Sequence, residues 1–322
     1  MTQIKDQRDY PKFEGIRTFM RLPHQTSLEG VDFAVVGVPF DTGATFRVGA
    51  RFGPHGIRSE SLLLRPYNPD LGVGIFENCV GVDYGDLLIT PGYLPESYLQ
   101  IEQAAGVVIA KKVTPVFIGG DHSISFPLLC AVHSTFGRVA LIHFDSHTDV
   151  HPGYFGGKDM HGTPFRRAVE QDLIDVSRSI QIGLRGSTYD STGRHESEEL
   201  GFKIVTAATL HDIGVQETLK LIRQRVGAGP AYLSFDIDFV DPAYAPGTGT
   251  PEVGGFTSAH CQQLVRGLVG VQFVGFDMVE VIPAYDPAGI TCLLAANLIH
   301  EFLSLIALQK SPRHLEQAIP QQ

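Results

Sequence analysis

Apolar runs recur along this chain, and most of them are followed by a stretch with helical character. Seven runs are rich in β-branched or aromatic residues: 31–38, 114–118, 139–144, 179–184, 203–205, 231–235 and 273–276. Their apolar residues are nearly continuous, whereas a strand with one solvated face alternates apolar and polar residues. The pattern therefore predicts parallel strands that are buried on both faces.

Helical segments lie between these strands. The helix candidates are 98–110, 216–225, 258–269 and 291–308. Strands that alternate with helices predict an α/β fold in which helices cover both faces of a parallel sheet. No internal repeat, low-complexity tract or long linker divides the chain, so we expect one domain over residues 1–322. Residues 1–30 are polar and punctuated by proline, and we expect them to form an arm over the surface or over a neighbouring subunit.

The composition narrows the class of protein. Of the 322 residues 43% are hydrophobic, which is enough for a substantial core. A formal net charge of -10 argues against nucleic acid as a partner. The polar start of the chain and the lack of an apolar run approaching about 18 residues predict a cytoplasmic protein without a membrane span. The cysteines lie far apart and form no CxxC pair, so we expect reduced core side chains.

Acidic and histidine side chains gather directly after the predicted strands, where open α/β sheets place their sites. Following three different strands, these are His122, then Asp145, His147 and Asp149, then Asp236 and Asp238. Residues two apart in an extended chain face the same way, so each set is expected to point toward a common centre. Four carboxylates in one place repel one another unless cations lie between them. We therefore predict a metal site.

The ligand types favour divalent cations. An isolated Asp-x-Asp pair is usually a helix cap or part of a solvated loop, but here carboxylates and imidazoles come together from three strands. Such a set suits Mn²⁺, with Ni²⁺, Co²⁺ or Zn²⁺ as alternatives. Two metals about 3.5 Å apart can hold a water between them and lower its pKa toward ~7. The sequence therefore predicts a two-metal hydrolase with Mn²⁺ as the preferred cofactor and Ni²⁺ as the main alternative.

The motifs around these residues resemble those of the ureohydrolase family, to which arginase and agmatinase belong. The matching segments are GGDHS at 119–123, HFDSHTD at 143–149, SFDID at 234–238 and APGTGTPE at 245–252. The resemblance covers nearly the whole chain. It implies a three-layer αβα sandwich around a mostly parallel sheet of about eight strands. It also implies a homo-oligomer, either a trimer or a hexamer.

The resemblance also assigns roles to the site residues. One metal takes His122, Asp145, Asp149 and Asp236, the other takes His147, Asp145, Asp236 and Asp238, and Asp145 and Asp236 bridge the two. The implied reaction is the hydrolysis of a guanidino group to urea and an amine, through attack of a hydroxide on the guanidinium carbon. His161 resembles the histidine that transfers a proton to the amine, although a surface-loop histidine is the alternative. Glu280 resembles the carboxylate that grips the guanidinium, although a structural ion pair is the alternative.

Two residues inside the HFDSHTD motif need separate interpretation. The family usually has alanine where this chain has Ser146. Alternation along an extended chain would turn the Ser146 side chain away from the metals, so we expect this departure to be tolerated. His143 faces the same way as Asp145 but lies deeper in the strand, and we interpret it as a buried, hydrogen-bonded histidine.

The substrate is harder to predict than the reaction. Arginases carry an asparagine where this chain has His151 and an Arg-Asp-x-Asp-like loop where it has 185–189, and both departures argue against arginine. The segments at 21–24 and 161–170 look most like guanidinobutyrases and guanidinopropionases. We therefore predict a guanidino acid, 4-guanidinobutyrate or 3-guanidinopropionate. Its binding residues are expected to be His151, Tyr154, Arg185 and Glu280. Lys158 near the mouth would favour a carboxylate tail if it faces the substrate, and a solvated surface lysine is the alternative.

Other hypotheses stay open at this point. The same chemistry could act on agmatine, guanidine, an alkylguanidine or a biguanide. The chain could instead be a non-catalytic partner subunit of a ureohydrolase complex, which the loss of a bridging aspartate would favour. A deacetylase on the related fold is a further alternative, and the paired metal motifs oppose it.

Overall fold

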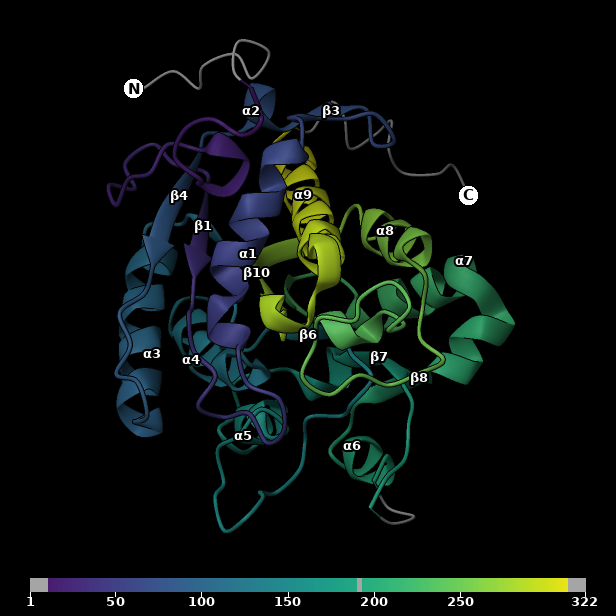
Figure 1. Ribbon diagram of the computed structural model, residues 1–322. Helices are drawn as coiled ribbons and strands as arrows, with labels where there is room; N and C mark the ends of the chain where they lie inside the picture. Colours follow the sequence, from purple (N-terminus) through teal and green to yellow (C-terminus); the bar gives the residue numbers. More distant parts are fainter. Residues whose placement is uncertain (1–10, 190–192, 312–322) are drawn as a thin grey trace.

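A parallel sheet forms the centre of the computed structural model, which describes residues 11–189 and 193–311 (Figure 1). In these residues eight strands follow the order β4-β1-β5-β10-β9-β6-β7-β8, and every neighbouring pair is parallel. The strands are β1 (Phe33–Gly37), β4 (Gly81–Asp86), β5 (Thr114–Ile118), β6 (Ala140–Phe144), β7 (Ile180–Leu184), β8 (Lys203–Thr206), β9 (Pro230–Asp236) and β10 (Gln272–Val279). A short antiparallel pair, β2 (Tyr67–Asn68) and β3 (Val73–Gly74), lies outside this sheet.

Helices cover both faces of the sheet. They are α1 (Gly53–Glu60), α2 (Ile75–Asn78), α3 (Leu94–Ala110), α4 (Ser125–Phe136), α5 (Pro164–Glu170), α6 (His195–Glu199), α7 (Ala207–Val226), α8 (Ser258–Arg266) and α9 (Ile290–Lys310). Along β1, Phe33 and Val35 join the core under α1, α7, α8 and α9, whereas Ala34 and Val36 join the core under α3, α4 and α5. The predicted αβα sandwich with strands buried on both faces is confirmed.

All seven predicted strands are present, with ends that shift by a few residues, and the four predicted helices correspond to α3, α7, α8 and α9. The sequence did not reveal β4, whose residues GVDYGD contain no apolar run and become exposed toward the end of the strand. It also did not reveal α1, which begins with glycine and proline and holds another glycine. Both elements depend on tertiary packing more than on local pattern.

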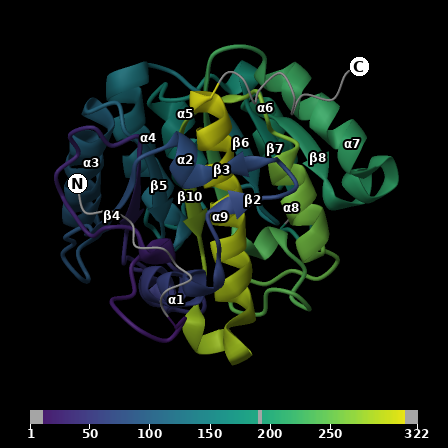
Figure 2. The same cartoon turned by 90° about the horizontal axis from the view of Figure 1, so that it is seen from above.

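The helix α9 is the one described helix that is long and apolar enough to cross a membrane. The window Pro287–Lys310 has a mean hydropathy of 1.8, and 78% of it is buried inside the protein. Figure 2 shows α9 crossing the sheet, and it packs against α1 and α8. Its buried Glu301 accepts hydrogen bonds from Asn68 and Arg266. Because most of the helix is buried against the sheet and its neighbouring helices, and because it carries a buried carboxylate, we interpret α9 as a core helix and not as a membrane span.

The described part of the N-terminal arm lies along the edge of the sheet. The Asp83 N–H of β4 donates to the Pro23 carbonyl over 3.0 Å, and the Asp83 carbonyl accepts from the Gln25 N–H over 3.2 Å. The side chains of Phe19 and Leu22 are buried in the core. The arm therefore covers the open edge of β4 and satisfies part of its backbone.

The strand order brings the sequence motifs together. Since all strands run parallel, their carboxyl ends lie at one edge of the sheet, and β5, β10, β9 and β6 are consecutive neighbours there. The predicted metal ligands at the ends of β5, β6 and β9, and Glu280 directly after β10, are far apart in sequence and converge at this edge.

Candidate metal centre

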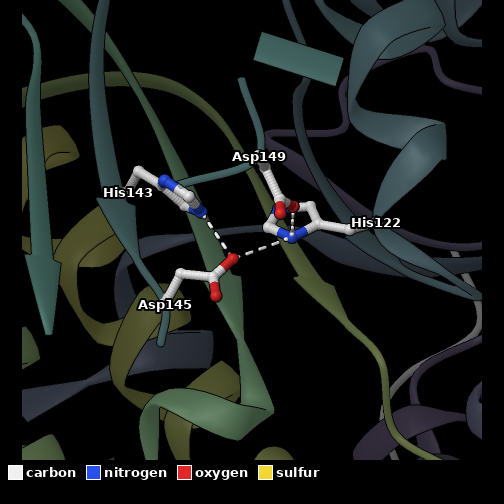
Figure 3. Close-up of side chains that lie close together, drawn as sticks. All are labelled: His122, His143, Asp145 and Asp149. Carbon is white, nitrogen blue, oxygen red and sulfur yellow. Dashed lines mark hydrogen bonds and ion pairs between the residues drawn. The ribbon is translucent and has the colours of Figure 1, made fainter. Parts of the chain in front are cut away.

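His122 stands at the centre of three carboxylates. Its Nδ1 lies 3.1 Å from Asp145 Oδ2, 2.8 Å from Asp149 Oδ2 and 3.2 Å from Asp236 Oδ2. All four side chains are buried. Among the described residues, His122 Nδ1 has no hydrogen-bond partner of acceptable geometry although three oxygens surround it. Figure 3 shows two of them, from Asp145 and Asp149. A buried nitrogen with this environment fits a metal ligand better than a structural hydrogen bond.

A second group forms around His147. Its Nδ1 lies 3.0 Å from Asp238 Oδ2 and 3.5 Å from Asp145 Oδ1. Asp238 Oδ2 is buried, and no part of the described chain donates a hydrogen bond to it. The His147 side chain is 34% exposed, whereas the His122 side chain is 1% exposed. Asp145 presents one oxygen to each histidine, which supports its predicted bridging position.

The charges of the two groups need cations or protons for balance. Burial lowers the pKa of His122, but the charge of Asp149 and neighbouring carboxylates outweighs it and raises that pKa well above its usual value. Likewise, Asp238 and Asp145 outweigh burial and raise the pKa of His147. Burial, together with the charges of Asp238 and Asp145, raises the pKa of Asp236. Metal ions would therefore compete with protons for this site, as expected for a buried carboxylate and histidine cluster.

A chain of hydrogen bonds holds His122 from behind. Ser234 Oγ donates to Asp277 Oδ1 over 2.6 Å and lies 2.8 Å from His122 Nε2. Asp277 also accepts from Ser125 and Tyr232. Because the serine proton goes to the carboxylate, Ser234 Oγ is free to accept from His122 Nε2–H. This assigns the lone pair of His122 to Nδ1, the nitrogen that faces the three carboxylates.

His143 lies beside this cluster and is held in a similar way. Its Nε2 is 2.7 Å from Asp145 Oδ2 (Figure 3). Its Nδ1 is 3.0 Å from the side-chain amide of Gln181. Its Nε2 lies close enough to His122, Asp145 and Asp149 to belong to the same potential metal-binding group. However, an amide donor at Nδ1 leaves the proton on Nε2, which then donates to Asp145. The geometry supports the prediction of a buried, hydrogen-bonded histidine.

His161 and Glu280 meet at the edge of the centre. Glu280 Oε1 lies 3.1 Å from His161 Nδ1 and accepts from the backbone N–H of His122 over 2.9 Å. The other ring nitrogen of His161 is 2.6 Å from Thr45 Oγ1, a contact that the sequence did not reveal. Burial lowers the pKa of His161, but its hydrogen bond to Glu280 and the charge of Glu280 raise it to about 9. The raised pKa favours the protonated ring of His161.

Strained backbone occurs at two of these positions. Asp149 has a φ of 53° and Glu280 a φ of 64°, in the left-handed region that residues other than glycine rarely adopt. Such conformations persist only where the surroundings hold them, and they concentrate at functional sites. The alternation used to align Asp145 with Asp149 therefore stops within the loop after β6.

Ser146 corrects one sequence-based expectation. Its Oγ donates to Asp238 Oδ1 over 2.8 Å and lies 3.1 Å from His147 Nδ1. The prediction that this side chain turns away from the metal-binding residues is wrong. Alternation holds only in extended backbone, and β6 ends at Phe144, one residue before the motif turns.

A cavity of about 330 Å³ opens above the centre. Its floor includes the side chains of His147, Asp149 and Asp236, and His161 lies in its wall. Its mouth contains His151, Tyr154, Tyr189 and Arg194. The rings of His151 and Tyr154 lie 5.0 Å apart, and those of His151 and Tyr189 lie 6.1 Å apart, so the three form an aromatic cluster.

Three residues with predicted roles at the substrate have other contacts in the structure. Arg185 lines the cavity, but its Nη2 donates to the carbonyls of Asp238 and Glu252 over 2.6 and 2.8 Å. Lys158 is exposed and is not among the lining residues. Glu280 is 1% exposed and does not line the cavity either. Arg194, which the sequence did not single out, also lines the cavity, and no other residue in the described part of the chain forms an ion pair with it.

Comparisons with known proteins agree with this geometry. Residues 31–304 match the Arginase family. A guanidinobutyrase from Pseudomonas aeruginosa is 45% identical over 92% of this chain and 94% of its own length. A mitochondrial agmatinase from Gallus gallus is 45% identical over 91% of this chain and 86% of its own length. The solved structure of a proclavaminate amidino hydrolase from Streptomyces clavuligerus aligns with a TM-score of 0.89 at 41% identity, over 92% of this chain and 99% of that one.

Proposed function

The chain belongs to the arginase family, and from this premise we propose that it hydrolyses a guanidino acid to urea and an amino acid. It is a hydrolase that acts on C–N bonds, as its relatives are. One observation carries the proposal: the side chains of the predicted centre lie together at the ends of neighbouring strands, and three of them, His147, Asp149 and Asp236, line one cavity together with His161. A non-catalytic partner subunit would not need this complete set, and two adjoining metal-binding groups oppose the deacetylase alternative.

The donor set fits two divalent cations. Two buried atoms without hydrogen-bond partners, His122 Nδ1 and Asp238 Oδ2, face the positions where ions would bind. We propose Mn²⁺, with Ni²⁺ as the alternative, because both accept imidazole and carboxylate ligands. The residues that would hold them are His122, Asp145, Asp149 and Asp236 for one ion, and His147, Asp145, Asp236 and Asp238 for the other. When bound, the ions would supply the acidity that makes water a nucleophile near neutral pH.

The proton for the leaving amine comes from His161 in this proposal. Thr45 and Glu280 hold both nitrogens of its ring, so the imidazole keeps one orientation toward the cavity. As the C–N bond to the amine breaks, the amine nitrogen takes the His161 proton and carries the electron pair of the bond away. Glu280 Oε1 accepts a hydrogen bond from the backbone N–H of His122 and contacts His161 Nδ1. We retain it as the partner of the guanidinium through Oε2, for which no described residue supplies a hydrogen bond.

The tail of the substrate decides between a guanidino acid and agmatine. A guanidino acid ends in a carboxylate, whereas agmatine ends in an ammonium group. At the mouth of the cavity, Arg185 is occupied by backbone carbonyls, and its guanidinium lies near the charge of Glu252. Arg194 lines the same mouth, and the described chain provides no acidic partner for it. We infer that Arg194 pairs with the carboxylate, while His151 and Tyr154 flank the tail.

A urea-release panel tests this function. Metal-free protein is loaded with Mn²⁺ and, separately, with Ni²⁺, and is then given 4-guanidinobutyrate, 3-guanidinopropionate, agmatine, guanidine, an alkylguanidine and a biguanide. We expect the highest kcat/KM with one of the two acids. A higher kcat/KM with agmatine would keep the chemistry and replace the substrate. No urea from any compound with either metal would contradict the proposed function itself.

Two further expectations concern the oligomeric state and the location of the protein. We propose a trimer or hexamer, by analogy with the family, and we propose a cytoplasmic location. Light scattering coupled to gel filtration measures the mass of the assembly against the 35.1 kDa of one chain. A monomeric mass would contradict the first expectation.

A further inference from the structure

Ser146 touches both residues that are particular to the His147 half of the centre. Its Oγ donates to Asp238 Oδ1 over 2.8 Å, and its backbone N–H donates to the same oxygen over 3.0 Å. The same Oγ lies 3.1 Å from His147 Nδ1. Ser146 is 1% exposed, so water does not compete freely for these contacts.

The two hydrogen bonds from Ser146 leave the two oxygens of the Asp238 carboxylate in different environments. Oδ1 accepts both hydrogen bonds from Ser146. Oδ2 accepts none from the described chain, is buried, and faces His147 Nδ1 at 3.0 Å. The hydroxyl thus fixes the rotation of the carboxylate so that its free oxygen points to the place where an ion would bind.

The single hydroxyl proton also matters for His147. Asp238 Oδ1 is the nearer acceptor and carries negative charge, so the proton goes to it rather than to the imidazole. Ser146 therefore does not occupy the lone pair of His147 Nδ1 with a hydrogen bond. Both atoms that would hold the ion, one on each residue, stay available.

The two histidines differ in what supports them. The Ser234–Asp277 chain orients His122 through Nε2, and His122 is fully enclosed. The described chain gives His147 Nε2 no such partner, and the His147 side chain is 34% exposed. The His147 half is thus the more open one. The orientation of its metal-binding side chains depends on the loop that carries Ser146.

We propose that Ser146 is a positioning residue that raises the metal affinity of the His147–Asp238 half without changing that of the His122 half. This inference rests on the two-metal centre of the proposed function. Hydrogen-bonding residues behind metal ligands typically change affinity by about 10–100-fold when they are removed. Ser146 thereby compensates for the exposure of His147 and keeps the solvent-facing ion in place.

Metal titration of the full-length chain tests the proposal. Wild-type, Ser146→Ala and Ser146→Thr proteins are stripped with chelator and titrated with Mn²⁺ in a calorimeter, and electron paramagnetic resonance then distinguishes single from spin-coupled ions. For Ser146→Ala we expect one ion to bind with wild-type affinity and the other about 10–100-fold more weakly. The coupled signal should then appear only at higher Mn²⁺. Ser146→Thr keeps the hydroxyl and should restore the tighter binding.

Two further variants make the result specific. Ser97 lies in α3 and is also buried, and its Oγ donates to the Thr90 carbonyl over 2.9 Å, so Ser97→Ala should leave both affinities unchanged. Ser234→Ala removes the support of His122 and should weaken the other ion instead. The melting temperature of each metal-free variant shows whether the fold is intact.

The outcomes separate this inference from the proposed function. Unchanged affinities in Ser146→Ala, or equal weakening of both ions, would overturn the positioning role. An unchanged metal titration with a raised KM would assign the hydroxyl to the substrate and overturn it as well. Failure of the wild-type protein to bind two ions or to release urea would contradict the proposed function, and it is visible without any variant.

Discussion

The floor and the mouth of the cavity are built from different kinds of structure. The floor follows directly from buried strand ends, and its residues Asp149 and Asp236 are 5% and 3% exposed. The mouth consists of loops, where Tyr189 is 86% exposed. Strand ends hold the groups that cut the substrate, because parallel pairing fixes their positions to one another. Loops hold the groups that select it, because they can change without disturbing the sheet.

The largest effect on activity should come from substituting a metal-binding residue at the floor of the cavity. Asp236→Asn keeps the shape of a proposed bridging ligand but removes its charge, and we expect urea release to fall by about 10³-fold or more. Metal content measured by mass spectrometry should fall with it. Asp172→Asn, at an exposed carboxylate that pairs with Arg138, is the matched control and should retain full activity. Full activity in Asp236→Asn would contradict the proposed centre.

The next largest effect should come from the wall of the cavity, at His161. His161→Asn should lower kcat by about 10²–10⁴-fold, the usual contribution of a proton donor, while both ions stay bound. The sign of the pH effect follows from its raised pKa of about 9. His161 is protonated and active below this pKa and loses its proton above it. Two bound cations nearby would lower this pKa.

The pH dependence of kcat therefore gives a second measurement. Wild-type protein should lose activity as the pH rises through a value at or below about 9, the pKa of His161 before the cations lower it. His161→Asn should lack this alkaline decline. If the variant shows the same decline as the wild type, another group donates the proton.

A smaller and more selective effect is expected at the mouth. Arg194→Ala should raise KM for 4-guanidinobutyrate about tenfold, because a charge-assisted hydrogen bond contributes about 1.5–3 kcal/mol and solvent reduces it here. Turnover of agmatine should stay equal or improve, because its ammonium group no longer meets a cation. Lys158→Ala is the matched control, since Lys158 is exposed outside the cavity, and it should change neither substrate. Equal loss for both substrates in Arg194→Ala would remove its role in tail recognition.

The same contrast explains what could be predicted from the sequence. The strands and the clustered His and Asp residues lie in short motifs where chemistry and local structure coincide, so a linear reading finds them. Ser146 was assigned the wrong direction because the alternation rule ends where β6 ends. Thr45 was missed because it reaches His161 across 116 residues of sequence, through a loop that carries no periodic signal.

Residues at the mouth were the least predictable. Lys158 has the right charge in the right segment but lies outside the cavity, whereas Arg194 enters it from the turn before α6. Arg185 was predicted to bind the substrate, yet its guanidinium nitrogens donate to backbone carbonyls of neighbouring loops. In each case the loop path decides whether a charge faces the cavity, and no local pattern encodes that path.

The smallest effect should come from the outermost aromatic residue, and it separates the two regions most cleanly. Tyr189 is exposed and contacts His151 edge to face, so Tyr189→Ala should change KM by about threefold or less and the free energy of unfolding by about 0.5 kcal/mol or less. Phe165 is its counterpart at the floor, fully buried with its ring 4.4 Å from that of His143. Phe165→Ala should cost about 3–5 kcal/mol of stability, measured by urea unfolding of the metal-free protein. A Tyr189 variant as unstable as the Phe165 variant would show that the mouth is part of the rigid scaffold, and the division between a fixed floor and an adaptable mouth would then fail.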